Sequence, residues 1–483
     1  MNGFVKPVLL LALAPATLAA QASKYTRPPV LPVAAALTVP TVRSSALPNG
    51  VQLRVVEQHE LPLVQVTLNV AGGSRLDGQT PGITTFMAGM LDEGAGSRDA
   101  LGLQSELAYL GASLSTTADW DRISVSLKVP VRALPAALAL MADVVMRPTF
   151  PAEEVRRQRD LRLTGLLQAR DQPGTIAGLA FNQVLFPATH PYARNALGDS
   201  ATVAAYDSAT VRRFYESAMR PDRASLFIVG DVNEAQVRTL MAQHLGSWRA
   251  TGTPIALPTA PAAVSAPATT RVWLVDKPNA AQSVIIIGWP GVERTSPDYA
   301  ALQVMNTLLG GSFTSRLNDN LREQHGYAYG ARSGFRRNLT GGLFQVATDV
   351  QTDKSGPAVG EVFKELERIL TPAAADEVER ARNYAALGYA GDFETTGQLA
   401  QRMVDAVVYG LADGFYEGFV PKALAVDAAA LQQAARGAID TKKLALVVVG
   451  DRAKVEAPLR ALNLGEIKNL TVDEVMGKAP AIE

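Results

Sequence analysis

Two stretches of this chain, far apart in the sequence, share one pattern. ASLFIVGDVNEAQVRTLMAQHLG (224–246) resembles LALVVVGDRAKVEAPLRALNLG (444–465), and in both an apolar strand pattern ends in Gly-Asp before a helical pattern. The Gly-Asp pairs begin at Gly230 and Gly450, an offset of 220 residues. Self-similarity at one large offset indicates a duplicated domain rather than a solenoid of short repeats.

Other segments are related by a similar offset. LVQVTLNVAGG (63–73) matches SVIIIGWPG (283–291), and MLDEGAGSRDALGLQSELAYLGA (90–112) loosely resembles LLGGSFTSRLNDNLREQHGYAYGA (308–331). Each copy begins with strand patterns, continues with helical patterns and ends with a return strand and helix. This order predicts an α+β fold of two homologous α/β sandwich domains, each a mostly antiparallel sheet with helices packed on it.

The predicted domains can be given boundaries. TGTPIALPTAPAAVSAPATT (251–270) is rich in proline, alanine and threonine, which is typical of an exposed linker. We therefore expect an N-terminal domain at 44–250 and a C-terminal domain at 271–483. Within the first, DRISVSLKVP (121–130) alternates apolar and polar residues and predicts a half-buried antiparallel strand.

The N-terminal segment is expected to be absent from the mature protein. Residues 1–22 contain a short apolar run, and AQAS (20–23) fits a small-residue cleavage site after Ala22, a combination that resembles a secretory signal peptide. The run is too short and too broken by proline for stable membrane insertion. Residues 23–43 contain four prolines and predict an extended arm. An exported, periplasmic protein is the expectation.

The composition of the chain excludes several kinds of partner and of metal site. Lys plus Arg equals Asp plus Glu at 46 each, which gives no electrostatic reason to expect nucleic acid or an anionic membrane as a partner. The absence of cysteine excludes disulfides and thiolate metal sites. No two of the four histidines are spaced to present a zinc-binding pair on one helix, and each is interpreted as a surface or capping residue: His59, His190, His244 and His325.

One helical pattern has no charged side chain and no strong metal ligand on its inner turns. PGITTFMAGMLDEG (81–94) has the apolar spacing of a buried helix, but its turns carry only small or weakly polar residues, Thr84, Thr85, Ala88 and Gly89. A glycine in the middle of a helix costs about 1 kcal/mol relative to alanine. These residues alone do not explain why the helix is built in this way.

A second segment, LREQHGYAYG, groups polar side chains that could act together. We expect Arg322 in the last turn of an amphipathic helix that Gly326 ends in the left-handed conformation. Tyr327 and Tyr329 then begin a strand and, being two residues apart, are predicted to share a face. A purely structural interpretation is equally complete, since arginine suits a helix C-terminus and tyrosine suits strands.

With these segments in view, nearly all of residues 44–465 resembles the insulinase/pitrilysin family of zinc peptidases, the inverzincins. Members have two such sequence-related halves, so the resemblance implies insulinase-like clamshell halves. It is carried by the two segments just described and by LPNGVQLRVVEQ (47–58), HPYARNALGD (190–199) and FYESAMRPDRASLFIVGD (214–231).

The resemblance explains the helix at 81–94. In active members that helix carries His-x-x-Glu-His, whose histidines bind zinc and whose glutamate activates water. The matching positions here hold Thr85, Ala88 and Gly89, and a more distal glutamate ligand of the family would fall near Thr164–Gly165. The resemblance therefore implies that this chain binds no metal, although an active peptidase with an unusual metal site is a further interpretation.

The C-terminal half, unlike the N-terminal half, has residues that match functional residues of the family. Arg322 and Tyr329 match the family's pair that hydrogen-bonds the substrate carbonyl and stabilises the oxyanion. Some family enzymes are heterodimers, in which one subunit lacks the zinc motif and the other carries zinc. The resemblance thus implies a non-catalytic subunit that acts in trans on peptide substrates bound as an added strand at a sheet edge of a zinc-bearing partner. GASLSTTAD (111–119) is the candidate edge in this chain, and a catalytically inert peptide-binding or structural assembly protein is the alternative.

Overall fold

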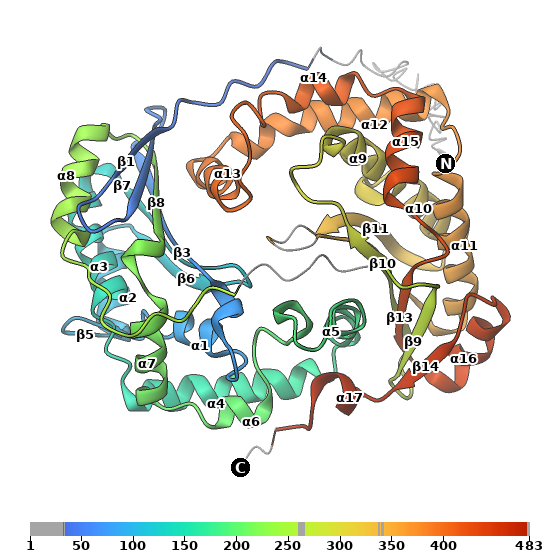
Figure 1. The fold of residues 1–483 in the computed structure, drawn as a ribbon, viewed down its shortest axis with the longest axis horizontal. Helices are drawn as coiled ribbons and strands as arrows, with labels where there is room; N and C mark the ends of the chain where they lie inside the picture. Colours follow the sequence, from blue (N-terminus) through green and yellow to red (C-terminus); the bar gives the residue numbers. More distant parts are fainter. Residues whose placement is uncertain (1–31, 33, 259–265, 337–338, 340–341, 481–483) are drawn as a thin grey trace, which may run out of the picture. The chain divides into compact units, whose positions relative to one another are not determined.

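The apolar runs of the sequence form two six-stranded sheets in the computed structural model (Figure 1). The structure describes residues 32, 34–258, 266–336, 339 and 342–480. The predicted signal peptide, residues 23–31 and 33 of the predicted arm and the middle of the predicted linker lie outside the described residues. Residues 36–483 group into one unit by their contacts, and the description below concerns this unit.

The first half of the chain supplies the strands of one sheet, in the order β1-β2-β8-β3-β7-β6. These strands are β1 (Arg43–Ala46), β2 (Gln52–Glu57), β3 (Leu63–Ala71), β6 (Ser113–Ala118), β7 (Arg122–Pro130) and β8 (Ala224–Gly230). A separate two-stranded ribbon consists of β4 (Gly94–Ala95) and β5 (Arg98–Asp99). The helices are α1 (Ile83–Gly89), α2 (Ala100–Tyr109), α3 (Leu134–Met146), α4 (Ala152–Ala169), α5 (Pro173–Leu185), α6 (Ser200–Ala204), α7 (Ser208–Ala218) and α8 (Glu234–Leu245).

The second half supplies the other sheet, in the order β11-β12-β10-β13-β9-β14. Its strands are β9 (Arg271–Asp276), β10 (Gln282–Gly291), β11 (Ala328–Arg336), β12 (Gly342–Gln351), β13 (Ala445–Gly450) and β14 (Ile467–Leu470). Its helices are α9 (Tyr299–Asn306), α10 (Arg316–Asn318), α11 (Ser355–Arg368), α12 (Ala375–Gly388), α13 (Thr396–Val408), α14 (Phe419–Leu424), α15 (Ala428–Ala438), α16 (Arg452–Ala461) and α17 (Val472–Met476). Within the described part of the chain, no helix has both the length and the apolar character needed to cross a membrane.

The two sheets repeat one topology, which confirms the predicted pair of homologous, mostly antiparallel domains. The order β2-β8-β3-β7-β6 corresponds to β9-β13-β10-β12-β11. In both, the first pair is parallel and the following three pairs are antiparallel. The sheets differ at one edge, where β1 runs antiparallel to β2 but β14 runs parallel to β9. The strands β6 and β11 occupy equivalent edge positions.

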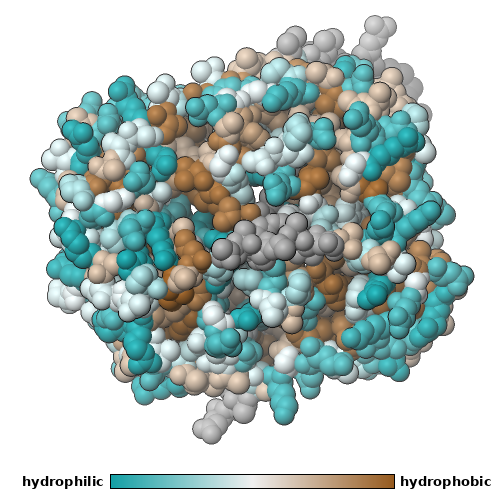
Figure 2. All heavy atoms as spheres, viewed as in Figure 1, coloured by the Kyte–Doolittle hydropathy of each residue, from teal (hydrophilic) through white to brown (hydrophobic). Residues whose placement is uncertain are grey.

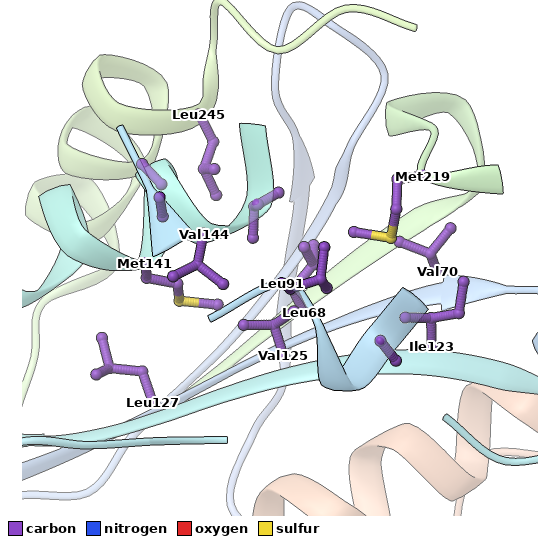
Figure 3. Packing of buried hydrophobic residues seen from close by; sticks show 14 of the residues in the cluster. Leu68, Val70, Leu91, Ile123, Val125, Leu127, Met141, Val144, Met219 and Leu245 are labelled. Carbon is purple, nitrogen blue, oxygen red and sulfur yellow. The ribbon is translucent and has the colours of Figure 1, made fainter. Parts of the chain in front are cut away.

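The core of the first sheet follows from the alternation in its strands. In β7, every second residue from Ile123 to Val129 is buried, as the sequence predicted for residues 121–130. Figure 3 shows Val125 near Leu68 of β3, with Met141 and Val144 of α3 above the sheet. Burying one such side chain contributes roughly 1.5–3 kcal/mol to folding, so the face that α3 covers is fixed by the period of the strands.

Each sheet is also covered by a helix from the other half of the chain. Helix α5, from the first half, packs on β10 and β13 of the second sheet. Helix α13, from the second half, packs on β3 and β8 of the first sheet (Figure 1). The contact under α5 is close: a Cβ added at Gly288 of β10 would lie 2.6 Å from the ring of Phe181. The two halves of the sequence are therefore not two self-contained cores.

Candidate functional site

The segment that carries Arg322 turns sharply before it becomes a strand. Arg322 lies in the last turn of a π-helical segment, Asp319–Gln324, and Gly326 follows with a φ of +63°. The amide of Tyr327 donates to the Leu321 carbonyl at 2.8 Å, and β11 begins only at Ala328. This left-handed turn is the helix ending that the sequence predicted.

The expectation that Tyr327 and Tyr329 share a strand face is wrong. Because the Tyr327 amide closes the helix, this residue precedes the strand, and its ring stacks on His325 with centroids 4.9 Å apart. The strand register is also irregular between Ala328 and Ala331, so simple alternation does not hold there. Tyr329 alone of the two tyrosines belongs to the edge strand.

Arg322 and Tyr329 lie together. The guanidinium carbon of Arg322 is 5.3 Å from the centroid of the Tyr329 ring and 4.6 Å from that of Phe313. Such cation–π contacts contribute about 0.5–1 kcal/mol each at exposed positions and orient the guanidinium plane. Tyr329 is 88% exposed, and Nε of Arg322 lies 3.3 Å from the carboxylate of Glu323.

Both side chains line one pocket of about 340 Å³. Phe313 and Tyr384 also line it and are 66% and 58% exposed. Asn318 connects its walls, since its amide nitrogen donates to the Phe313 carbonyl at 2.6 Å and its oxygen accepts from the Ala331 amide at 3.2 Å. The sequence analysis missed these three residues; the segment GGSFTSRLNDN contained two of them but gave no sign of Tyr384.

The chemistry of this pocket is hydrogen-bond donation. A guanidinium and a phenol are both protonated near neutral pH, so both can donate hydrogen bonds there. Aimed at one carbonyl oxygen, two such donors can stabilise the negative charge that develops there during acyl transfer. Among the described residues, no group of three or more histidine, aspartate and glutamate side chains is arranged to hold a metal ion.

The positions that match the family's zinc ligands lie on α1 of the first half, and the start of this helix is held by Asp77. The Asp77 carboxylate accepts hydrogen bonds from the amides of Gly82 and Thr84, at 2.8 and 3.0 Å, and so caps the helix. Burial raises the pKa of Asp77 to about 6, although these hydrogen bonds act in the opposite direction. The helix ends at Gly89, so the expectation of a mid-helix glycine is wrong; the amide of Met90 bonds to Met87, three residues back, and closes the turn.

The family-matched positions of α1 do not fit zinc. Ala88 and Gly89 have no ligand atom, and Gly89 is exposed. The hydroxyl of Thr85 is already engaged, 2.7 Å from the carbonyl of Ala196. On α4, the Thr164 hydroxyl donates to the Asp160 carbonyl of its own helix at 2.9 Å.

An arginine that the sequence analysis did not single out occupies this region. Nη1 of Arg162, on α4, donates to the Thr85 hydroxyl at 2.8 Å, and its guanidinium carbon lies 5.3 Å from the Phe86 ring centroid. Burial lowers the pKa of Arg162, and no ion pair joins it to a carboxylate in the part of the chain that the structure describes. A cation therefore lies beside the positions where the zinc ligands of an active relative would be.

The four histidines remain separate in the structure. His59 pairs with Asp231 at 2.7 Å, and His325 lies 3.7 Å from Glu361. The Nδ1 of His190 accepts from the Tyr192 amide at 3.1 Å. His244 lies in the last turn of α8. These contacts match the predicted surface and capping roles and bring no two histidines together.

Comparisons with known proteins agree with this geometry. A family model described as "Insulinase (Peptidase family M16)" matches residues 54–177, and one described as "Peptidase M16 inactive domain" matches residues 206–384. Together the two matches span more than half of the chain, and the chain belongs to the insulinase family of peptidases. The second match includes Arg322 and Tyr329.

Individual relatives extend over most of the chain. An uncharacterized zinc protease of Streptomyces coelicolor is 27% identical over 370 residues, covering 75% of this chain and 80% of that protein. A probable mitochondrial-processing peptidase subunit beta of Arabidopsis thaliana is 23% identical over 430 residues, covering 86% of this chain and 79% of that protein.

Solved structures have the same fold. A peptidase M16 inactive domain from Pseudomonas fluorescens matches with a TM-score of 0.78 and 25% identity, covering 85% of this chain and 98% of that one. A protease from Helicobacter pylori matches with a TM-score of 0.79 and 18% identity, covering 85% of this chain and all of that one, and at this identity it supports the fold alone. The chain is thus an insulinase-family member in which Thr85, Ala88 and Gly89 stand at the positions that match the family's zinc motif.

Proposed function

We propose that this chain is the non-catalytic subunit of an exported, heterodimeric zinc peptidase. In this proposal a zinc-bearing subunit of the same family hydrolyses the peptide, and Arg322 and Tyr329 of this chain bind the substrate carbonyl and stabilise the oxyanion in trans. The chain itself needs no cofactor, and the zinc belongs to the partner.

The contrast between the two halves is the observation that carries the proposal. The Arg322 guanidinium and the Tyr329 ring line one open pocket 5.3 Å apart, whereas Thr85, Ala88 and Gly89 offer no metal site. Two neighbouring donor side chains at an open pocket, in a chain without zinc ligands, fit a site that a second subunit completes. Tyr329 is 88% exposed and buries little surface, so packing alone does not account for its position.

Peptides are proposed to bind in extended form beside a sheet edge. The predicted edge segment at 111–119 contains β6, which lies at the edge of the first sheet, while β11 with Tyr329 lies at the equivalent edge of the second. An edge strand leaves one row of backbone donors and acceptors open to an added strand. In the proposal the strand added for catalysis pairs with the partner, and the edge at β6 is not required.

The test begins with co-purification from the source cell, followed by peptide hydrolysis by this chain, the zinc-motif relative and their mixture. We expect hydrolysis only from the mixture or the native complex. In the complex, Arg322→Ala should lower kcat/KM by about 10²–10³-fold, as loss of one oxyanion donor does elsewhere, and Tyr329→Phe should lower it in the same direction.

Two matched control variants separate this effect from the general effect of changing an exposed side chain. Tyr109→Phe changes a tyrosine that is 91% exposed on α2, and Arg132→Ala changes an exposed arginine outside the pocket. Both should leave turnover unchanged. Unaltered kcat/KM in Arg322→Ala and Tyr329→Phe complexes would overturn the trans-acting role.

The alternative is a catalytically inert peptide-binding or structural assembly protein of the same fold, and the missing zinc ligands also favour it. It predicts that mixing with a zinc-motif relative gives no gain in hydrolysis. Stoichiometric, tightly bound zinc in the isolated chain would contradict both proposals and support an active peptidase with an unusual site.

Export is the second part of the proposal, and it rests on the sequence of residues 1–22. Cell fractionation should find the protein in the periplasm, with a mature N-terminus at Ser23 by mass spectrometry. An N-terminus that still contains residues 1–22, in a protein that fractionates with the cytoplasm, would contradict export.

A further inference from the structure

The pocket of Arg322 and Tyr329 adjoins a second, larger one. This neighbour has a volume of about 520 Å³ and is lined by residues of β11 and β12. Gly330 and Arg332 line both pockets, so the two meet at the edge strand. A peptide whose carbonyl reaches Arg322 and Tyr329 would therefore bring a neighbouring residue beside Arg332.

Arg332 is the exposed cation at this junction. It lies opposite Ala347 in the strand register, so its side chain shares a sheet face with Gln345, Ala347 and Asp349. No hydrogen bond or ion pair links Arg332 to another residue in the described ranges, and the diagonal carboxylate, Asp349, forms no ion pair with it. Its donors are available to a ligand.

Its two arginine neighbours are already oriented by other groups. Arg322 lies against the rings of Phe313 and Tyr329. Arg336 donates to Asn182 of α5, and its guanidinium carbon lies 5.1 Å from the Trp120 ring centroid. Among the described residues, the lining of the joined pockets thus includes three arginines and one carboxylate, Asp349, and Arg332 is the one of these arginines without a fixed partner.

Figure 2 shows hydrophobic residues in patches between hydrophilic ones over one face of the molecule. The lining of the joined pockets combines exposed aromatic rings, those of Phe313, Tyr329 and Tyr384, with the arginines.

We infer that Arg332 forms a subsite for an acidic side chain, so that the substrates of this subunit are peptides with aspartate or glutamate near the carbonyl held by Arg322 and Tyr329. This inference rests on the proposed function, which makes the substrate a peptide, and it adds that the peptide carries a negative charge near the bound carbonyl. Arginine suits this task because its fork of N–H donors matches a carboxylate in two parallel hydrogen bonds. The carboxylate of Asp349 repels the acidic side chain of the peptide because both carry negative charge. Binding of that side chain therefore depends on Arg332.

Binding to the isolated full chain tests the subsite directly. Fluorescence anisotropy is measured with labelled decapeptides in which one glutamate, or its isostere glutamine, is moved along an otherwise neutral sequence. At one or two positions the glutamate peptide should bind about tenfold more tightly than its glutamine twin. Arg332→Gln should abolish the difference, Arg332→Glu should favour a lysine peptide, and Asp349→Asn should widen the preference for glutamate.

The control variant is Arg132→Gln, an exposed arginine outside both pockets, which should leave every affinity unchanged. Equal affinities for the glutamate and glutamine peptides, no peptide binding by the chain, or a preference that survives Arg332→Gln would each overturn the inference. Circular dichroism of each variant confirms that a lost preference is not lost folding.

A second measurement separates this inference from the proposed function. The same peptide pairs are given to the assembled complex, and kcat/KM is compared. Hydrolysis without a charge preference would overturn the acidic subsite and leave the trans-acting role intact. Acid-selective binding to the chain through Arg332, in the absence of any hydrolysing complex, would support the subsite and overturn the proposed catalytic partnership.

Discussion

A single side chain, Arg162, places a positive charge beside the positions on α1 that match the family's zinc motif. Small residues at positions 85, 88 and 89 leave out the metal ligands, but they do not by themselves keep cations away. The Arg162 guanidinium, 2.8 Å from the Thr85 hydroxyl, adds a fixed positive charge. Two unit charges 4 Å apart interact by about 4 kcal/mol at an effective dielectric constant of 20, and a divalent ion doubles this value. Arg162 on α4 therefore disfavours a divalent cation at these positions, in addition to the absence of zinc ligands on α1.

We predict that restoring the ligands alone does not restore zinc. A chain with Thr85→His, Ala88→Glu, Gly89→His and Thr164→Glu should bind zinc roughly a hundredfold more weakly than the same chain with Arg162→Val added. Metal analysis after dialysis against graded zinc buffers gives the comparison. Equal zinc content in the two variants would show that Arg162 does not oppose the metal.

Asp77 gives a pH-dependent prediction at the same scale. Burial raises its pKa from 3.8 to about 6, so the folded chain holds this proton more tightly than the unfolded one. The stability that this group contributes is complete below pH 3.8 and is lost as the pH rises through about 6. Relative to Asp77→Asn, the wild type should lose about 1.4 kcal/mol of unfolding free energy per pH unit in that window. Urea titrations at several pH values measure this, and a constant difference would contradict it.

At the scale of elements, the exchange of α5 and α13 decides which surfaces become core. Neither helix packs chiefly on the sheet of its own half. Their apolar faces are ordinary by sequence, since periodicity shows only that one face is buried. The close approach of α5 to β10 adds a steric requirement, because a side chain at Gly288 would meet the Phe344 carbonyl as well as the Phe181 ring.

Gly288→Ala should therefore destabilise the protein by about 1–3 kcal/mol, the usual cost of overpacking a filled core. Gly334→Ala on β11 is the matched strand control, since a Cβ there meets no atom within 4 Å. Chemical denaturation of both variants tests the contrast. A Gly288→Ala variant as stable as Gly334→Ala would mean that α5 can move away from β10 at little cost.

At the scale of the whole molecule, the exchanged helices make the two halves dependent on each other. Each half, expressed alone, would expose one apolar helix face and one apolar sheet face. The separate buried clusters that contain α5 and α13 include residues from both halves, such as Phe181 with Val447 and Phe227 with Leu399. We expect neither 44–250 nor 271–483 to fold stably by itself.

A cut between the halves should consequently leave them together. If residues 259–265 are replaced by a protease site and cleaved, the two pieces should co-elute in gel filtration as one species. Ile176→Asp on α5 combined with Leu399→Asp on α13 should allow the cleaved pieces to separate, because both side chains are buried in the exchanged contacts. Separation of the cleaved wild type would show that the exchange does not hold the halves.

Much of this protein was determined by its sequence alone. The 220-residue offset predicted the duplicated topology, the alternation at 121–130 predicted β7, and Gly326 predicted the turn after Arg322. These features are local or repeated, so the period of side chains and the conformational freedom of one glycine suffice to specify them. The tertiary structure alone decided that α5 and α13 exchange sheets, that Arg162 reaches Thr85, and that Asn318 joins the walls of the pocket. Periodicity states which face of an element avoids water, but it does not state which distant element covers that face or which charge enters the space beside it.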